Sequence, residues 1–152
     1  MKPIAKVRKI ARHFRKWAEA NCKELGFGFS DCSGMCGHAS YEIFDALRLE
    51  GFSVQFCCND NHCFVRWYDE NDVDYLVDVT ATQFLSTLPK VIVRRFDNRP
   101  KDIGSVSVDD VWQIDAQAET PEEVEEILAD WPNEQKPQQF QHPFKKLQHR
   151  AA

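Results

Sequence analysis

The pattern of apolar and polar positions divides the chain into two helical segments, a series of strands and a third helix. Over residues 4–25 apolar side chains recur at steps of three and four, which predicts an amphipathic helix that Gly26 ends. The Lys and Arg side chains of this basic segment (residues 1–26) are expected on the solvated face, with the apolar face packed on the domain. A second helix is predicted from about Ser33, as its N-cap, to Gly51.

The middle of the chain is rich in aromatic and β-branched residues, which predicts strands separated by turn-like sequences such as NDN and DENDV. These strands are expected at residues 52–58, 62–68, 74–80, 91–96 and 105–114. Trp112 is interpreted as an anchor of its own strand. Residues 120–131 (TPEEVEEILADW) predict a short helix, because a Thr cap, a Pro and acidic residues open it.

The order helix, helix, mostly antiparallel strands, helix predicts an α+β fold in one domain, residues 1–131. From Pro132 the composition becomes rich in Gln and Pro without a sustained period, so residues 132–152 are expected to form an extended or disordered tail. No apolar run approaches the roughly 18 residues that span a membrane, and no secretory signal opens the chain. We therefore expect a cytoplasmic protein without a membrane partner.

The net charge of −5 is unevenly distributed along the chain. Residues 1–16 hold seven Lys or Arg and no acid, so the remainder carries a net charge of −12. Because this acidic remainder repels phosphate, a nucleic acid is not expected as a partner. A partner helix or a membrane surface could use the basic face, but a helix packed on its own domain is the simpler interpretation.

Five of the six cysteines lie within residues 32–63. In a reducing compartment they are not expected to form a disulfide framework, which leaves free thiols, metal ligands or a catalytic thiol. Cys57 and Cys58 are neighbours in a predicted strand and should point to opposite faces of the sheet.

Cys36 lies in the first turn of the predicted second helix, where unpaired N–H groups and the helix dipole favour a thiolate. His62 opens one predicted strand and Asp78 lies near the end of the next. A hairpin around residues 69–73 places position 62 opposite about 78 or 80, on the same sheet face. This arrangement would let Asp78 orient His62 as a base for Cys36.

The segments GMCGHASYEIFDALRLEGFSVQF, NHCFVRW and YLVDVTATQF resemble the transglutaminase-like division of the papain-like cysteine enzymes. The resemblance covers residues 33–84, with Cys36, His62 and Asp78 at the positions of the family's catalytic triad. It implies an α+β core in which the Cys-bearing helix packs on a mostly antiparallel sheet. It also implies acyl transfer through a thioester, without a cofactor, on a glutamine or amide group of a protein or peptide.

The sequence does not identify the side chain that completes an oxyanion hole. Gly37 and the backbone N–H of Cys36 would allow a substrate carbonyl to approach, and Ser30, Asp31 or Gln83 could contribute a further donor. Water and an amine are both open as acceptors of the acyl group.

Two other functions are compatible with these residues. The first is a non-catalytic protein-binding module on the same fold, with an idle triad. The second is a zinc-binding module built from the Cys and His cluster. Because C-x3-C-x-H followed by C-C-x3-H-C is not a familiar zinc spacing, no metal ligand is assigned.

Overall fold

The structure, a computed structural model, describes residues 1–22, 35–100 and 111–130. Its described elements are the helices α1 (Pro3–Cys22), α2 (Cys36–Leu49) and α4 (Pro121–Ala129), and the strands β1 (Ser53–Cys58), β2 (Cys63–Tyr68), β3 (Asp74–Asp78), β4 (Ile92–Arg95) and β5 (Ala116–Ala118). Two single turns of 3₁₀ helix, η1 (Ala81–Gln83) and η2 (Phe96–Asn98), follow β3 and β4. The described part of the chain is therefore α+β, as the sequence predicts.

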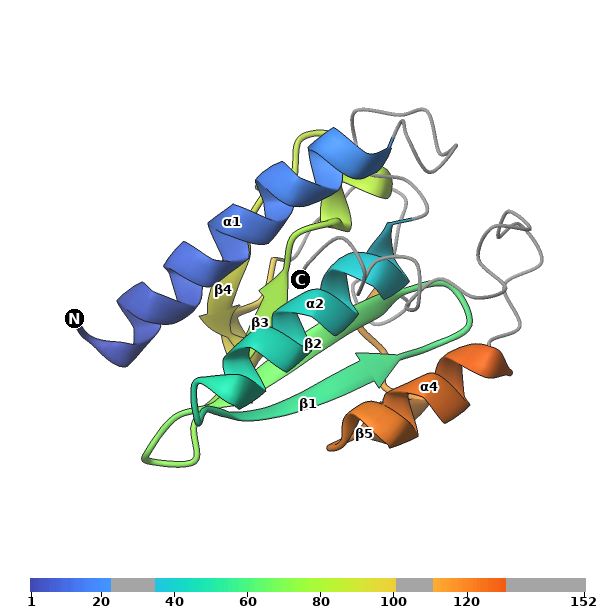
Figure 1. Cartoon of the computed structure of the whole chain (residues 1–152). Coiled ribbons are helices and arrows are strands. Elements are labelled where there is room, and N and C mark those ends of the chain that lie inside the picture. The colour runs from blue at the N-terminus through green and yellow to red at the C-terminus, as the bar shows by residue number, and fades with distance from the viewer. Residues whose placement is uncertain (23–34, 101–110, 131–152) are drawn as a thin grey trace.

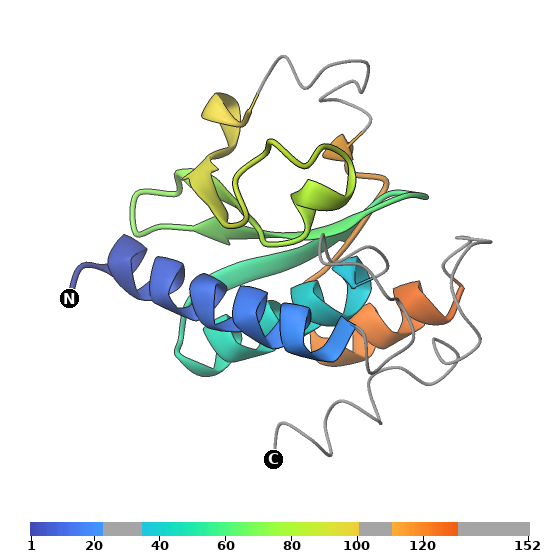
Figure 2. The same cartoon turned by 90° about the horizontal axis from the view of Figure 1, so that it is seen from above.

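The strands form one antiparallel sheet in the order β4-β3-β2-β1-β5. All three helices lie on one face of this sheet, with α2 between α1 and α4 and packed on β1 and β2 (Figure 1). Seen from above, η1 and η2 lie on the opposite side of the sheet (Figure 2). The sequence prediction of a Cys-bearing helix packed on an antiparallel sheet is thus confirmed.

Alternation along the strands creates two apolar cores, one on each face of the sheet. The helix-side core contains Cys58 and Val65 among its buried residues, and the loop-side core contains Cys57 and Phe64. The two adjacent cysteines therefore point to opposite faces, as predicted from the period of two.

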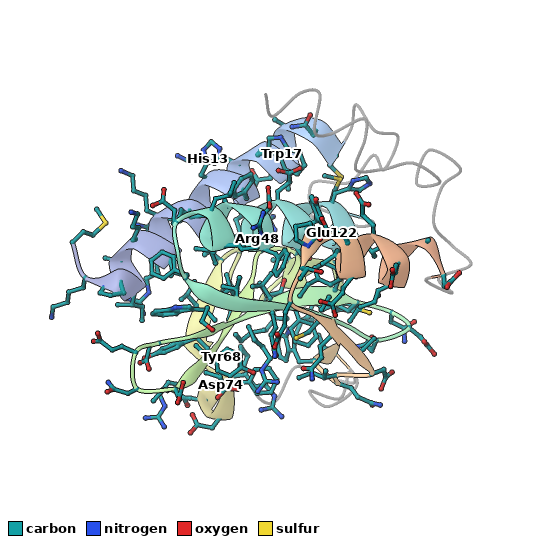
Figure 3. All side chains as sticks on the ribbon, turned by 60° about the horizontal axis from the view of Figure 1, so that its bottom comes forward. His13, Trp17, Arg48, Tyr68, Asp74 and Glu122 are labelled. Carbon is teal, nitrogen blue, oxygen red and sulfur yellow. The ribbon has the colours of Figure 1, made fainter. Side chains whose placement is uncertain are left out.

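Helix α1 packs against α2 and β4, and its apolar face buries Val7, Ala11 and Ala18 in the helix-side core. His13, labelled in Figure 3, points away from the sheet on the opposite face. The prediction that every Lys and Arg of this helix is solvated is wrong for Arg15, which is only 4% exposed.

The buried guanidinium of Arg15 ties α1 to the segment that follows β3. Its Nη1 donates to the backbone oxygen of Val79 at 2.9 Å and to Thr82 Oγ1 at 2.8 Å, and its Nε donates to Glu19 Oε1 at 2.7 Å. Since Val79 directly follows Asp78, Arg15 helps to fix the backbone that comes after Asp78.

Arg15→Met is expected to lower the free energy of unfolding by about 2–3 kcal/mol, because it leaves the buried Val79 carbonyl and Thr82 hydroxyl without this donor. Urea denaturation would measure the loss. Arg12→Met, the same change at an exposed position of the same helix, is the matched control and should have little effect. Equal losses in the two variants would contradict a special role for Arg15.

Three further sequence predictions need correction or lie outside the described residues. Of the strand predicted at 105–114, residues 105–110 lie outside the described residues and residues 111–114 are not in a strand. Strand β5 at Ala116–Ala118 pairs with β1 instead and was not predicted, because Ala-Gln-Ala carries no strand signal. Helix α2 begins at Cys36 with Met35 as its N-cap. Ser33, Gly26 and the tail at 132–152 lie outside the described residues.

The third predicted helix is confirmed as α4, with Thr120 as its N-cap. Thr120 Oγ1 accepts from the backbone N–H of Glu123 at 3.2 Å, and Pro121 occupies the first position of the helix. Within the described ranges, none of the helices is both long enough and apolar enough to cross a membrane.

Candidate active site

The thiol of Cys36 lies at the start of α2, above the beginning of β2. Cys36 is the first residue of the helix and is 2% exposed. One turn later, Ser40 Oγ donates to the backbone oxygen of Cys63 at 3.0 Å and so anchors this end of α2 to β2. The first turn of the helix is thereby held against the strand that His62 precedes.

His62 and Asp78 meet because of the register of β2 and β3. Val65 pairs with Val77, so the same register places Phe64 opposite Asp78 and His62 opposite Thr80. His62 Nε2 lies 2.7 Å from Asp78 Oδ2, and both side chains are fully buried. The predicted juxtaposition on one sheet face is confirmed.

The carboxylate of Asp78 is held by donors on both oxygens. Oδ2 accepts from His62 and from Trp112 Nε1 at 2.8 Å, and Oδ1 accepts from the Thr80 backbone N–H at 2.9 Å and the Thr80 hydroxyl at 3.4 Å. Burial by itself raises the pKa of Asp78, but the His62 charge and these donors outweigh it and hold the pKa below its ordinary value. Asp78 is therefore a carboxylate at neutral pH.

Trp112 is a site residue that sequence reasoning missed. It was interpreted as an anchor of its own strand, yet residues 111–114 form no strand and its indole N–H donates to Asp78. The two residues are far apart in the chain, and no local pattern in the sequence marks the contact.

The imidazole of His62 is enclosed by aromatic rings. It stacks on Phe64 with centroids 5.9 Å apart and meets Phe84 edge-on at 4.8 Å. Burial favours the neutral ring, but the negative charge and hydrogen bond of Asp78, together with Cys36, raise the pKa of His62 to about 10. His62 is therefore an imidazolium at neutral pH.

Gln83 contacts the other nitrogen of this ring. Its terminal amide lies 3.1 Å from His62 Nδ1. Because an imidazolium donates from both nitrogens, the amide presents its oxygen to Nδ1 in that state, and a half-turn of the amide presents its nitrogen to a neutral ring. Gln83 can thus accompany His62 through both protonation states.

The sulfur of Cys36 is stabilised as a thiolate. Hydrogen bonds from the Cys63 thiol, the hydrogen bond and charge of His62, and the Cys63 backbone N–H lower the pKa of Cys36 well below its ordinary value, although burial raises it. The backbone N–H of Cys63 is thus one of the donors that hold the Cys36 sulfur beside the start of β2.

The four weaker oxyanion candidates fall in different places. Gly37 is the second residue of α2, where backbone N–H groups have no intrahelical acceptor, and it is buried beside Cys36. Gln83 contacts the base His62. Ser30 and Asp31 lie outside the described residues.

Metal ligation is the other chemistry that the sequence of the Cys and His cluster suggests. Across residues 1–22, 35–100 and 111–130, no group of three or more His, Cys, Asp or Glu side chains is arranged to hold a metal ion. Cys32, one of the cysteines in the zinc alternative, lies outside these ranges.

The rate at which iodoacetamide alkylates Cys36 is expected to be nearly independent of pH through neutrality, because the thiolate is the reactive form and is already present. It should fall on the acid side, where the thiolate takes up a proton. Burial raises the pKa of Cys57 to about 12, so the rate of its alkylation should still rise in alkali. Cys57 is therefore the internal control. Peptide mass spectrometry of quenched samples gives both profiles, and a Cys36 rate that climbs steadily through neutrality would contradict the thiolate assignment.

Comparisons with known proteins leave the site to be interpreted from its own geometry. The chain matches no protein-family model, no curated protein and no solved structure.

Proposed function

We propose that this protein is a cysteine-dependent acyl-transfer enzyme that works through a thioester. The observation that carries the proposal is the continuous relay from the Cys36 thiolate through the His62 imidazolium to the Asp78 carboxylate. All three side chains are buried, so their charges interact in surroundings of low polarity. The resemblance of residues 33–84 to the transglutaminase-like enzymes supports the same reaction class and a papain-like core.

The first half of the reaction forms the thioester. The Cys36 thiolate attacks the carbonyl carbon of a carboxamide or peptide bond, and the resulting oxyanion accepts hydrogen bonds from backbone N–H groups at the start of α2, including that of Gly37. His62 gives its Nδ1 proton to the departing ammonia or amine. The C–N bond breaks and Cys36 holds the acyl group.

The second half of the reaction releases the acyl group. Neutral His62 removes a proton from water or from an amine, which attacks the thioester and restores the Cys36 thiolate. Asp78 stays ionised throughout and holds the imidazole through Nε2, while Trp112 and Thr80 hold Asp78.

A second function is favoured by the burial of the site. His62 has no exposed surface and Cys36 is 2% exposed, which suits a non-catalytic binding module with an idle triad. The two functions differ in whether the thiol can be acylated.

Labelling with thiol-directed acyl probes, read by mass spectrometry, tests the proposal. We expect a single acyl group on Cys36, followed by its loss to water or its transfer to an added amine, which also identifies the acceptor. His62→Gln should abolish acylation, whereas Cys57→Ala, the matched control at a buried thiol on the other sheet face, should not change it. Equal, slow labelling of all six thiols would refute the enzyme and favour the binding module.

A further inference from the structure

Three thiols form a continuous row beside the site, and acyl transfer needs only the first. The Cys36 sulfur accepts a hydrogen bond from the Cys63 thiol, and the Cys63 and Cys58 thiols are hydrogen-bonded to each other. All three belong to the helix-side core and are at most 3% exposed. Cys63 thus lies between the other two sulfurs.

The pairing of β1 with β2 brings Cys58 and Cys63 directly opposite each other. The backbone N–H of Asn59 donates to His62 O at 3.0 Å, and Cys58 O accepts from the Asp115 N–H on the other side of the strand at 2.9 Å. Cys58 and Cys63 are therefore a non-hydrogen-bonded pair. Cα atoms in such a pair are about 4.5 Å apart, which is within the range of about 4.4–6.8 Å that disulfides require.

We propose that Cys63 is a resolving thiol: when hydrogen peroxide oxidises Cys36, Cys63 converts the product to a Cys36–Cys63 disulfide, which Cys58 can exchange for a Cys58–Cys63 disulfide. The inference needs a reactive Cys36 and two neighbouring thiols. It does not need acyl transfer.

Each step balances in atoms and electrons. The Cys36 thiolate attacks one oxygen of the peroxide, the O–O bond breaks, hydroxide leaves, and the sulfur becomes a sulfenic acid by losing two electrons to the peroxide. The Cys63 sulfur then attacks the Cys36 sulfur, an S–S bond forms, the S–O bond breaks, and the hydroxyl leaves with the thiol proton as water.

Exchange with Cys58 would regenerate the nucleophile. The Cys58 sulfur attacks the Cys63 sulfur, the new S–S bond replaces the old one, and Cys36 leaves as a thiolate while the Cys58 proton is released. Cys36 is the favoured leaving group because the hydrogen bond and charge of His62 and the backbone N–H of Cys63, which remain when Cys63 is in a disulfide, stabilise the Cys36 thiolate. The disulfide would thereby move from Cys36 to the pair Cys58 and Cys63, where thiol reductants can reduce it.

The consequence is protection of Cys36 from irreversible oxidation. A sulfenic acid without a neighbouring thiol is oxidised further to a sulfinic acid, which thiol reductants do not reverse. Attack by the neighbouring Cys63 sulfur on the sulfenic acid is intramolecular, and it therefore competes with that second oxidation.

Peroxide treatment of the full chain, followed by intact-mass measurement and non-reducing peptide mapping, tests the inference without a substrate. We expect a mass lower by two hydrogen atoms, a link from Cys63 to Cys36 or Cys58, and full reversal by dithiothreitol. A Cys36 that gains oxygen atoms without a cross-link would overturn the inference. So would a link from Cys36 to Cys32.

Variants separate the steps. In Cys63→Ser and in Cys63→Ala, peroxide should oxidise Cys36 to the sulfinic acid at concentrations from which dithiothreitol still restores the wild-type thiol. A result from either variant is sufficient if only one of them folds. Cys58→Ala should trap the Cys36–Cys63 link, and Cys36→Ser should suppress both links. Cys57→Ala, the matched control, should behave as wild type. Cys63 variants that oxidise like wild type, or a Cys58–Cys63 link that forms at an unchanged rate without Cys36, would overturn the inference.

The outcome is independent of the proposed function. If acyl probes do not label Cys36 but the peroxide cross-link forms, the proposed acyl-transfer function is refuted and the resolving role of Cys63 is supported. If acyl probes label Cys36 but no cross-link forms, the acyl-transfer function is supported and the resolving role is refuted.

Discussion

Asp78→Ala is expected to lower the free energy of unfolding by about 3–5 kcal/mol near neutral pH. The substitution leaves the buried His62 imidazolium without its counter-charge and removes the acceptor of the Trp112 indole N–H and the Thr80 backbone N–H. Breaking one side of a buried ion pair is costly because the remaining charge stays away from water. Guanidinium denaturation with linear extrapolation would measure the loss.

Two controls isolate this cause. Asp74→Ala makes the same change on the same strand, but Asp74 pairs with Arg66 in a partly exposed ion pair, so about 1 kcal/mol or less is expected. Trp112→Phe removes one donor to Asp78 while keeping most of the aromatic surface, and should cost about 1–2 kcal/mol. Similar losses at positions 74 and 78 would show that the buried pair is not what stabilises the site.

The loss caused by Asp78→Ala should depend on pH in a defined direction. Because the folded pKa of Asp78 is depressed, its contribution is present above the unfolded value of about 3.9 and disappears as the pH falls through the folded pKa. Because the folded pKa of His62 is raised to about 10, its contribution is complete below the unfolded value of about 6.5 and disappears as the pH rises toward about 10. The difference between wild type and variant should therefore be largest between about pH 4 and 6.5.

Cys36→Ser is expected to reduce acylation, and any turnover that depends on it, by about a thousandfold or more. A serine hydroxyl beside His62 is not ionised at neutral pH, whereas the thiolate already is. The melting temperature should change by only a few degrees, about what 1 kcal/mol produces in a domain of this size, because the side chains have nearly the same shape.

The stability measurement makes this variant informative. Loss of acylation with a preserved melting temperature assigns the chemistry to the sulfur of Cys36. Cys57→Ser is the matched control, since it changes a buried thiol on the face of the sheet opposite to Cys36. Acylation retained in Cys36→Ser would eliminate the thioester mechanism.

Local patterns in the sequence predicted most elements correctly because each depends on neighbouring residues. Aromatic and β-branched residues between turn-like sequences identified β1 to β4, and the Thr120 cap with Pro121 identified α4. The alternation of side chains along paired strands brought His62 and Asp78 to one face, because a hairpin with few loop residues leaves little freedom in the register.

The errors have a common cause, which is contact between distant segments. Arg15 was assigned to solvent because arginine usually lies there, and only the carbonyl of Val79 and the hydroxyl of Thr82 explain its burial. Strand β5 exists because β1 has a free edge for Ala116–Ala118 to pair with, and not because of any propensity of those residues.

The sequence by itself determined the α+β class, the position of Cys36 at a helix start and the alignment of His62 with Asp78, because these follow from periodicity, helix starts and hairpin register. Only the tertiary structure decided that Trp112 holds the carboxylate and that Cys63 lies between Cys36 and Cys58. Those contacts depend on how α2 and the segment before β5 pack on the sheet, and the free energy of that packing is shared by many residues far apart in the chain.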